Sequence, residues 1–288
     1  MAATSPRIAS GRSPGGAVAA AFGRYAALIV AAVLFLIPFY LLVRNGLATD
    51  QELTAPTWKV FPTTLHWENL TGLFGGSIPM LTGLKNSLII AVLQTAGQLL
   101  VSAMAGYGLA RIPFRHANKI FYGVLATLMI PSAVTFVPSF VLVSTLGWVS
   151  SLRGLIIPGL FSAFATFLFR QYFLGFPKEL EESARVDGLT YWGAFWRIVV
   201  PNSMNFVAAI AVITFIGSWN AFLWPLVIGQ DDSAWTVQVV LSTFLTAQTI
   251  NISQLCMAAA VSILPLVFVF AFLQRWLVQG VAQTGIKG

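Results

Sequence analysis

Residues 203–228 read SMNFVAAIAVITFIGSWNAFLWPLVI, a run without a single Asp, Glu, Lys, Arg or His. A helix needs about 20 apolar residues to cross the roughly 30 Å hydrocarbon core of a bilayer. Because lipid offers the backbone no hydrogen-bond partner, a run of this length crosses the bilayer as an α-helix. The stretch therefore predicts a membrane-spanning helix and an all-α membrane fold.

Further runs without ionisable residues lie on both sides of this stretch, and their lengths are near or above the ~17–25 residues of a spanning helix. They cover residues 26–43, 86–110, 120–143, 154–169 and 255–274. Only 9% of the chain is charged, against about 25% in a soluble domain. The sequence therefore predicts an all-α integral membrane protein with six transmembrane helices. This composition excludes a disordered chain, a nucleic-acid-binding module and an ordinary cytosolic enzyme.

The basic residues indicate how the six helices are oriented. If the N-terminus is cytoplasmic, all 16 Lys and Arg residues lie on the cytoplasmic side except Arg44, Lys59, Lys85 and Arg153. Loops that stay in the cytoplasm carry an excess of Lys and Arg, so both termini are predicted to be cytoplasmic. The net charge of +7 is thereby explained as a topology signal, and no nucleic acid is required.

The same pattern divides the chain into segments. Residues 1–23, rich in Ala, Ser, Gly and Pro, are predicted to form a disordered cytoplasmic tail. Residues 24–280 form the six-helix transmembrane domain, and residues 281–288 form a cytoplasmic C-terminal tail. The alternative for the first apolar run is a cleaved signal peptide, but the run is longer than the ~7–15-residue core of such peptides. The external segment 44–85 is expected to be partly structured.

Inside the predicted spans the polar side chains are neutral. Ion-coupled carriers usually place ionisable residues in the membrane, and intramembrane proteases need catalytic or metal-binding groups there, so both classes are disfavoured. Neutral hydrogen-bonding groups beside aromatic rings suit a hydroxyl-rich solute such as a sugar. The alternative is that these side chains hold helices together, the role we favour for Gln94 and Gln98. The candidate solute-path residues are Gln94, Gln98, Ser132, Thr135, Ser139, Trp219 and Asn220.

The longest predicted cytoplasmic loop, residues 175–202, contains the sequence PKELEESARVDGLTYWGAFWRIVVP at residues 177–201. Its acidic residues follow Pro177 in a first helical turn, where the helix dipole favours negative charge. Gly188 is expected to end this helix in a left-handed conformation. A second short helix is predicted from Thr190 to Val200, ending before Pro201. The two helices would form a docking knob in which Glu182 is able to pair with an arginine of a partner.

The spacing of Glu182-Ser183-Ala184, Gly188, Ile198 and Pro201 resembles the EAA loop of the permease subunits of ABC importers. That loop reads E-A-A, three residues, G, nine residues, then I-x-L-P; Ser183 and Val200 are mild departures. Other stretches resemble the carbohydrate-importer branch typified by the maltose permease MalG. They are Asn86-Ser87, Trp219-Asn220 with Leu223-Trp224-Pro225, and the tail from Gln274 to Gly288. The resemblance extends from about residue 25 to the C-terminus.

This resemblance implies a type I ABC-importer permease fold in the bacterial cytoplasmic (inner) membrane. It implies an ABC ATPase dimer, a second homologous (MalF-like) permease subunit, an extracytoplasmic solute-binding protein, a carbohydrate solute and membrane lipid as partners. The chain would be a non-catalytic transport subunit that binds no cofactor or metal, with ATP and Mg bound by the ATPase. The alternatives from other classes are an ATP-independent secondary carrier or channel for a neutral solute, and a membrane enzyme such as a lipid transferase.

The resemblance also implies roles for particular positions. The ATPase-coupling residues would be Glu181, Glu182, Ser183, Ala184, Arg185, Asp187 and Gly188. The C-terminal contact with the ATPase would be made by Gln283, Lys287 and Gly288. The loop that contacts the binding protein would present Gln230, Asp231, Asp232 and Trp235.

Overall fold

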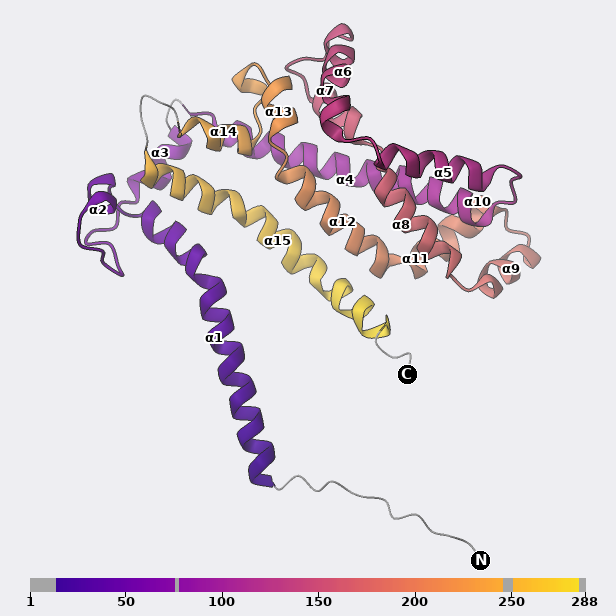
Figure 1. Ribbon diagram of the computed structural model, residues 1–288, viewed down its shortest axis with the longest axis horizontal. Coiled ribbons are helices and arrows are strands. Elements are labelled where there is room, and N and C mark those ends of the chain that lie inside the picture. The colour runs from indigo at the N-terminus through magenta and orange to yellow at the C-terminus, as the bar shows by residue number, and fades with distance from the viewer. Residues whose placement is uncertain (1–13, 76–77, 246–250, 285–288) are drawn as a thin grey trace, which may run out of the picture.

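The computed structural model describes residues 14–75, 78–245 and 251–284, and every regular element in those ranges is a helix (Figure 1). The first half contains α1 (Pro14–Gly46), α2 (Asp50–Thr54), α3 (Glu68–Gly75), α4 (Met80–Arg111), α5 (Ala117–Leu128), α6 (Ser132–Thr145), α7 (Leu152–Ile156), η1 (Ile157–Gly159) and α8 (Ala163–Leu174). The second half contains α9 (Lys178–Val186), α10 (Tyr191–Ala194), η2 (Phe195–Val199), α11 (Val200–Asn202), α12 (Met204–Trp219), α13 (Leu223–Ile228), η3 (Asp232–Ala234), α14 (Val237–Thr243) and α15 (Ile252–Thr284). The all-α prediction is confirmed.

Four helical segments of the described chain are long and apolar enough to cross a membrane: Ala20–Gly46, Met80–Arg111, Leu152–Leu174 and Ile252–Arg275. Two bent pairs pass the same test, and they raise the number to six if each pair is one span. The first pair joins α5 to α6 with a bend of 96°, and the second joins Tyr191–Asn202 to α12 with a bend of 79°. The predicted runs are therefore recovered as helices, and three of them, 120–143, 154–169 and 203–228, are each divided between two or more helices.

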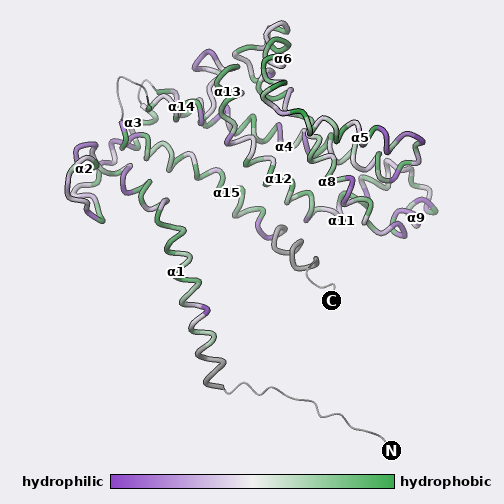
Figure 2. Tube along the Cα trace, in the orientation of Figure 1, coloured by the Kyte–Doolittle hydropathy of each residue, from purple (hydrophilic) through white to green (hydrophobic). Residues whose placement is uncertain are grey.

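Helices α1 and α15 run antiparallel. The end of α1 lies against the beginning of α15, since a Cβ added to Gly46 would lie 2.9 Å from the Met257 Cα. The N-terminal end of α1 and the C-terminal end of α15 therefore point to the same side of the molecule (Figure 1). Below this contact α1 diverges from the other helices, and its most apolar stretch is 0% buried. Figure 2 shows hydrophobic residues along most of its length.

Helix α4 is the centre of the bundle and packs against α8 and α12. Gly106 permits the close approach of α8, because a Cβ at this position would lie 2.7 Å from the Phe169 Cβ and 2.8 Å from the Arg170 backbone nitrogen. Aromatic rings fill the space beside this contact, among them Tyr107, Phe173 and Phe195. The closely packed α4–α8 pair is thus in contact, through these rings, with the segment around η2.

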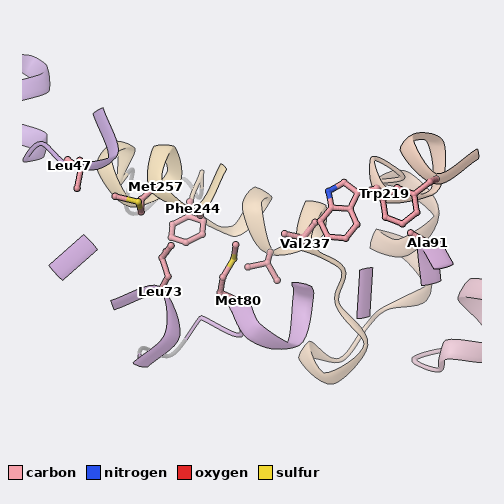
Figure 3. Close-up of a cluster of buried hydrophobic side chains, with 11 residues drawn as sticks. Leu47, Leu73, Met80, Ala91, Trp219, Val237, Phe244 and Met257 are labelled. Atoms are coloured by element: carbon pink, nitrogen blue, oxygen red, sulfur yellow. The ribbon is translucent and has the colours of Figure 1, made fainter. Parts of the chain in front are cut away.

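The largest buried cluster joins α3, α4, α12, α14 and α15 (Figure 3). Trp219 and Phe215 stack with ring centroids 5.9 Å apart, and Met80, Val237 and Met257 pack in the same cluster. Within a bilayer, such a cluster is stabilised by close van der Waals packing between the helices and not by removal of the side chains from water. The cluster holds the connections at the end of the molecule opposite to α9 (Figure 1).

Some predicted boundaries were wrong. Residues 14–23 belong to α1 rather than to a disordered tail, and α15 continues to Thr284, into the predicted C-terminal tail. The helical segment that begins at Tyr191 does not end before Pro201, since this proline lies within α11. A proline is tolerated there because it occupies the first turn of α11, where a missing N–H costs no helical hydrogen bond. The apolar run 203–228, predicted as one helix, is interrupted at residues 220–222, between α12 and α13.

Candidate functional site

Helix α9 and the turn after it form the loop predicted to dock a partner. Pro177 precedes the helix, and Gly188 follows it with a φ of +86°, the left-handed conformation that a glycine adopts without a steric penalty. The Leu189 N–H donates to the Ala184 carbonyl at 3.0 Å and closes the turn. The predicted helix and its glycine stop are both observed.

The inner side of α9 is attached to the end of α4. Glu181 is buried, and its Oε1 lies 3.1 Å from the Nε of Arg111, the last residue of α4. The Tyr107 hydroxyl donates to Glu181 Oε2 at 3.0 Å, and Arg111 also donates to the Phe176 carbonyl. Glu181 therefore anchors α9 to α4, because its carboxylate is held by these two side chains.

The outer side of α9 is free to meet another protein. Glu182, Ser183, Arg185 and Asp187 are exposed, whereas Ala184 is buried. Among the described residues Glu182 makes no ion pair within the 4.0 Å limit. Arg185 is held in place, since its guanidinium lies 4.4 Å from the centre of the Tyr191 ring and donates to the Tyr191 hydroxyl at 2.9 Å.

Sequence reasoning missed three features of this site. Val186 is 89% exposed and Leu180 is 44% exposed, so apolar surface lies beside Glu182. The sequence pattern gives Arg111 no role beyond that of one of the cytoplasmic basic residues, and it gives Tyr107 none. No local pattern links these two residues to α9; the contact exists only because α4 ends against the loop.

Two hollows lined by neutral residues lie between the helices. The first lies between α4, α8 and α12, and its polar residues are Gln94, Gln98, Ser162, Thr214 and Ser218. The second lies beside α6 and is lined by Gln94, Ser132, Thr135, Phe136, Ser139 and Trp224, among others. Five of the seven candidate solute-path residues therefore line a hollow, and neither lining contains an ionisable side chain.

Gln94 and Gln98 also hold the helices together, as favoured above. Gln94 Nε2 donates to the Leu155 carbonyl at 2.8 Å, and Gln98 Nε2 donates to the Gly159 carbonyl at 2.6 Å. The Ser218 hydroxyl donates to Gln94 Oε1 at 2.6 Å, so one amide connects α4 to both α7 and α12. The same side chains therefore line the first hollow and connect the helices around it.

Trp219 and Asn220 lie away from the two hollows. Trp219 is 1% exposed, and its Nε1 donates to the Ser262 carbonyl of α15 at 3.2 Å. It is therefore a packing residue and not a lining residue of either hollow, because its ring fills the core between α12 and α15. Asn220 is exposed at the break between α12 and α13, where its Oδ1 accepts from Gln238 at 3.3 Å.

The predicted binding-protein loop is folded against the first turns of α4 and the connection between α6 and α7. Its residues Gln230, Asp231 and Asp232 are exposed, and Trp235 is partly buried. The backbone N–H groups of Gln230 and Asp231 both donate to the Ser150 hydroxyl at 3.1 Å. The acidic side chains are thus presented to solvent on a fixed backbone.

Asn86 and Ser87, in the first turns of α4, hold the backbone of this loop by hydrogen bonds. Asn86 Nδ2 donates to the carbonyls of Ser233 and Trp235 at 2.8 and 2.9 Å, and the Val237 N–H donates to the Ser87 hydroxyl at 2.8 Å. The pair was noted only for its resemblance to the importer branch, and its physical role is to satisfy backbone groups of the loop.

The remaining predicted contacts lie at the C-terminus. Gln283 falls within α15, at a position where the structure does not describe side chains, and Lys287 and Gly288 lie outside the described residues. In the part of the chain that is described, no group of three or more His, Cys, Asp or Glu side chains is placed to hold a metal ion.

Comparisons with known proteins agree with this architecture. Residues 98–283 match the family described as binding-protein-dependent transport system inner membrane component. The chain is 34% identical to the arabinooligosaccharides transport system permease protein AraQ of Bacillus subtilis over 89% of this chain and 92% of the relative. It is 33% identical to the sn-glycerol-3-phosphate transport system permease protein UgpE of Yersinia pestis bv. Antiqua, over 89% of this chain and 94% of the relative.

A further relative and a solved structure extend the comparison. Identity to the lactose transport system permease protein LacG of Rhizobium radiobacter is 33%, over 89% of this chain and 93% of the relative. A chain of a bacterial ABC transporter involved in the import of the acidic polysaccharide alginate superposes with a TM-score of 0.79 at 19% identity, covering 93% of this chain and 99% of that chain. The resemblance to ABC-importer permeases is thus confirmed. The protein belongs to the family of binding-protein-dependent transport system inner membrane components.

Proposed function

We propose that the chain is the permease subunit of an ATP-driven, binding-protein-dependent importer of a carbohydrate in the bacterial cytoplasmic membrane. It would form half of the translocation path, and a second homologous permease subunit would form the other half. The permeases named above belong to transport systems for arabinooligosaccharides, lactose and sn-glycerol-3-phosphate. The proposal needs no cofactor on this chain, since ATP and Mg would be bound by a dimer of separate ATPase subunits.

The two-sided environment of α9 is the observation that carries this proposal. One side is attached to α4 through Glu181 and Arg111, and the other presents Glu182 to solvent beside the exposed Val186. A partner that moves α9 would therefore move the end of α4 with it. Arg185 and Tyr191 provide a second connection, toward η2 and α12. An element joined to two membrane helices in this way suits a coupling helix.

The coupling would act by alternating access. Closure of the ATPase dimer would displace α9, and α4 and α12, which line the first hollow, would shift with it. A ligand shifts a conformational equilibrium only as far as it interacts differently with the two states. The hydrogen bonds of Gln94 to α7 and α12 are contacts that such a shift would break or reform.

A neutral sugar or oligosaccharide is the solute class that the hollows favour. Hydroxyl and amide groups of the linings are able to exchange hydrogen bonds with sugar hydroxyls, and the Phe136 and Trp224 rings add apolar surface. Ligand sites commonly combine such apolar walls with a few placed polar groups. An anionic solute would favour cationic side chains along the path; neither lining contains one, so the second permease subunit would have to supply them.

The orientation and the outer contacts complete the proposal. Both termini would lie in the cytoplasm on the side of α9, where most Lys and Arg residues gather, in keeping with the positive-inside rule. The exposed Gln230, Asp231 and Asp232 would meet the solute-binding protein, with Trp235 supporting them from the partly buried side of the loop. Gln283, Lys287 and Gly288 would reach the ATPase, a contact that stays a prediction.

The test is to purify the wild-type chain and the Glu182→Ala variant, each together with the proteins co-expressed with it. We expect a separate ATPase subunit to co-elute with the wild type, and the substitution to release it or to uncouple ATP hydrolysis from transport. Glu179→Ala is the matched control, since Glu179 is an exposed acid of the same helix outside the EAA pattern. Full transport by this chain alone, unaffected by Glu182→Ala, would contradict the proposal and favour an ATP-independent carrier.

A further inference from the structure

The segment between α2 and α3 folds back along the end of α1. The Arg44 guanidinium donates to the Lys59 carbonyl at 2.9 Å and lies 5.9 Å from the centre of the Trp58 ring. Nearer to the middle of α1, the Tyr40 hydroxyl donates to the Val60 carbonyl, and the Tyr40 and Phe61 rings meet edge to face at 6.3 Å. Residues 58–61 therefore run beside the last turns of α1 (Figure 1).

These contacts fix the position of residues 58–61 along the axis of α1, and therefore their depth in a bilayer that α1 spans. Arg44 marks the polar end of this helix, and Tyr40 lies four residues before it, which is about 6 Å along the helix axis. The helix before Tyr40 belongs to the most apolar span of the chain, with a mean hydropathy of 2.8. Val60 and Phe61 therefore lie beside the apolar part of α1 and not beyond its polar end.

The side chains of this turn are large, apolar and exposed. Trp58 is 64% exposed, Val60 52% and Phe61 73%, and they continue the exposed apolar surface formed on α1 by residues such as Phe39 and Val43. A contiguous apolar patch of this kind is unfavourable in water and marks an interaction surface. The exposed Lys59 lies within the patch, and its Nζ donates to the Thr63 hydroxyl at 3.0 Å.

The turn is fixed in position from its polar side. The Thr63 N–H donates to Glu52 Oε1 at 2.8 Å, and the same carboxylate lies 3.9 Å from Arg44. The Thr63 N–H is the main reason why the pKa of Glu52 is lowered, with further contributions from the Thr63 hydroxyl and Arg44. The carboxylate therefore stays charged at neutral pH and keeps the turn against α1.

We infer that residues 58–61 form a membrane anchor, a surface that binds the phospholipids of the leaflet at the C-terminal end of α1. Trp58, Val60 and Phe61 enter the interfacial region of that leaflet, and Lys59 meets lipid phosphate. Aromatic rings concentrate at this depth of a membrane, and the lysine stem is long enough to keep its ammonium group in the headgroup layer. The surface is continuous with the lipid-facing side of α1, so the inference requires only that α1 spans the bilayer, whatever the chain transports.

Spin-label accessibility tests this inference on the full-length chain in phosphatidylcholine nanodiscs. Nitroxide labels are placed at Val60→Cys and at Phe61→Cys in a Cys256→Ser background, which removes the single native cysteine. Phe35→Cys, on the exposed apolar middle of α1, is the lipid reference, and Glu68→Cys, on an exposed acid of α3, is the water reference. We expect the ratio of oxygen to nickel-complex accessibility at both test sites to lie between those of the two references, clearly above that of Glu68→Cys.

Two results would overturn the anchor. A ratio like that of Glu68→Cys would place the turn in water, and low accessibility to both reagents would show that protein covers it. Fluorescence quenching by brominated phosphatidylcholine provides a second measurement that needs no label. The quenched fraction of tryptophan emission should fall in Trp58→Phe relative to the wild type, and an unchanged fraction would also contradict the inference.

Discussion

At the scale of single residues, Glu181 and Glu182 show how two neighbouring carboxylates of one helix acquire different roles. Glu181 is buried against Arg111 and Tyr107, whereas Glu182 is exposed. The sequence pattern placed both acids in the first helical turn, which is correct for Glu181 but not for Glu182, the fifth residue of α9. A helix presents successive residues about 100° apart. Which acid faces inward depends on where α4 ends, and this tertiary contact has no local signal.

Substitution of the buried acid should therefore destabilise the protein far more than substitution of the exposed one. Glu181→Ala leaves the Arg111 charge buried without its partner, which typically costs about 3–5 kcal/mol. Glu182→Ala removes an exposed side chain and should change the free energy of unfolding by less than about 0.5 kcal/mol. Thermal unfolding of the detergent-solubilised protein measures both. Equal losses of stability in the two variants would show that the Glu181–Arg111 pair does not anchor α9.

At the scale of helices, α4 and α8 approach so closely that one glycine decides their distance. A Cβ at Gly106 would lie 2.7 Å from the Phe169 Cβ, while a Cβ at Gly108, two residues later, would meet nothing within 4 Å. Gly106→Ala should cost about 1–3 kcal/mol, because either backbone or core side chains must move. Gly108→Ala should stabilise the helix by roughly 0.5–1 kcal/mol, since alanine restricts the unfolded chain more than glycine. The same unfolding measurement compares the two, and a neutral Gly106→Ala would refute the close contact.

The helices themselves were predictable, and their breaks only partly so. An apolar run is a local property, and each of the six predicted runs contains helix. The bend between α5 and α6 occurs at Pro131, a residue that sequence alone marks as a helix breaker. Pro138 and Pro225 lie inside α6 and α13, so proline by itself does not locate the breaks. The gap after Trp219, at residues 220–222, contains no proline or glycine, so no local residue type indicates it.

At the scale of the whole molecule, the contacts of α5 and α6 with α4 show how far this bent pair extends along the bundle. Asn118, in α5, accepts from Arg170, whose Nε donates to the Leu109 carbonyl near the end of α4. Val143, in α6, packs in a buried cluster with Ile90 of α4. Ile90 and Leu109 are 19 residues apart on one helix, which is roughly 28 Å. This separation is close to the thickness of the bilayer core, as expected if the pair crosses the membrane once.

The labelling of single cysteines by a membrane-impermeant maleimide tests this crossing and the orientation together. In a Cys256→Ser background, Leu146→Cys should be labelled in intact cells, whereas Lys119→Cys should be labelled only after permeabilisation. All the positions used are exposed in the chain, so differences report the side of the membrane and not burial. Glu179→Cys, on α9, is the cytoplasmic reference and should behave like Lys119→Cys. Labelling of Lys119→Cys and Leu146→Cys from the same side of the membrane would mean that α5 and α6 form a re-entrant loop. Labelling of Glu179→Cys in intact cells would place α9 outside the cell, where no ATPase is able to reach it.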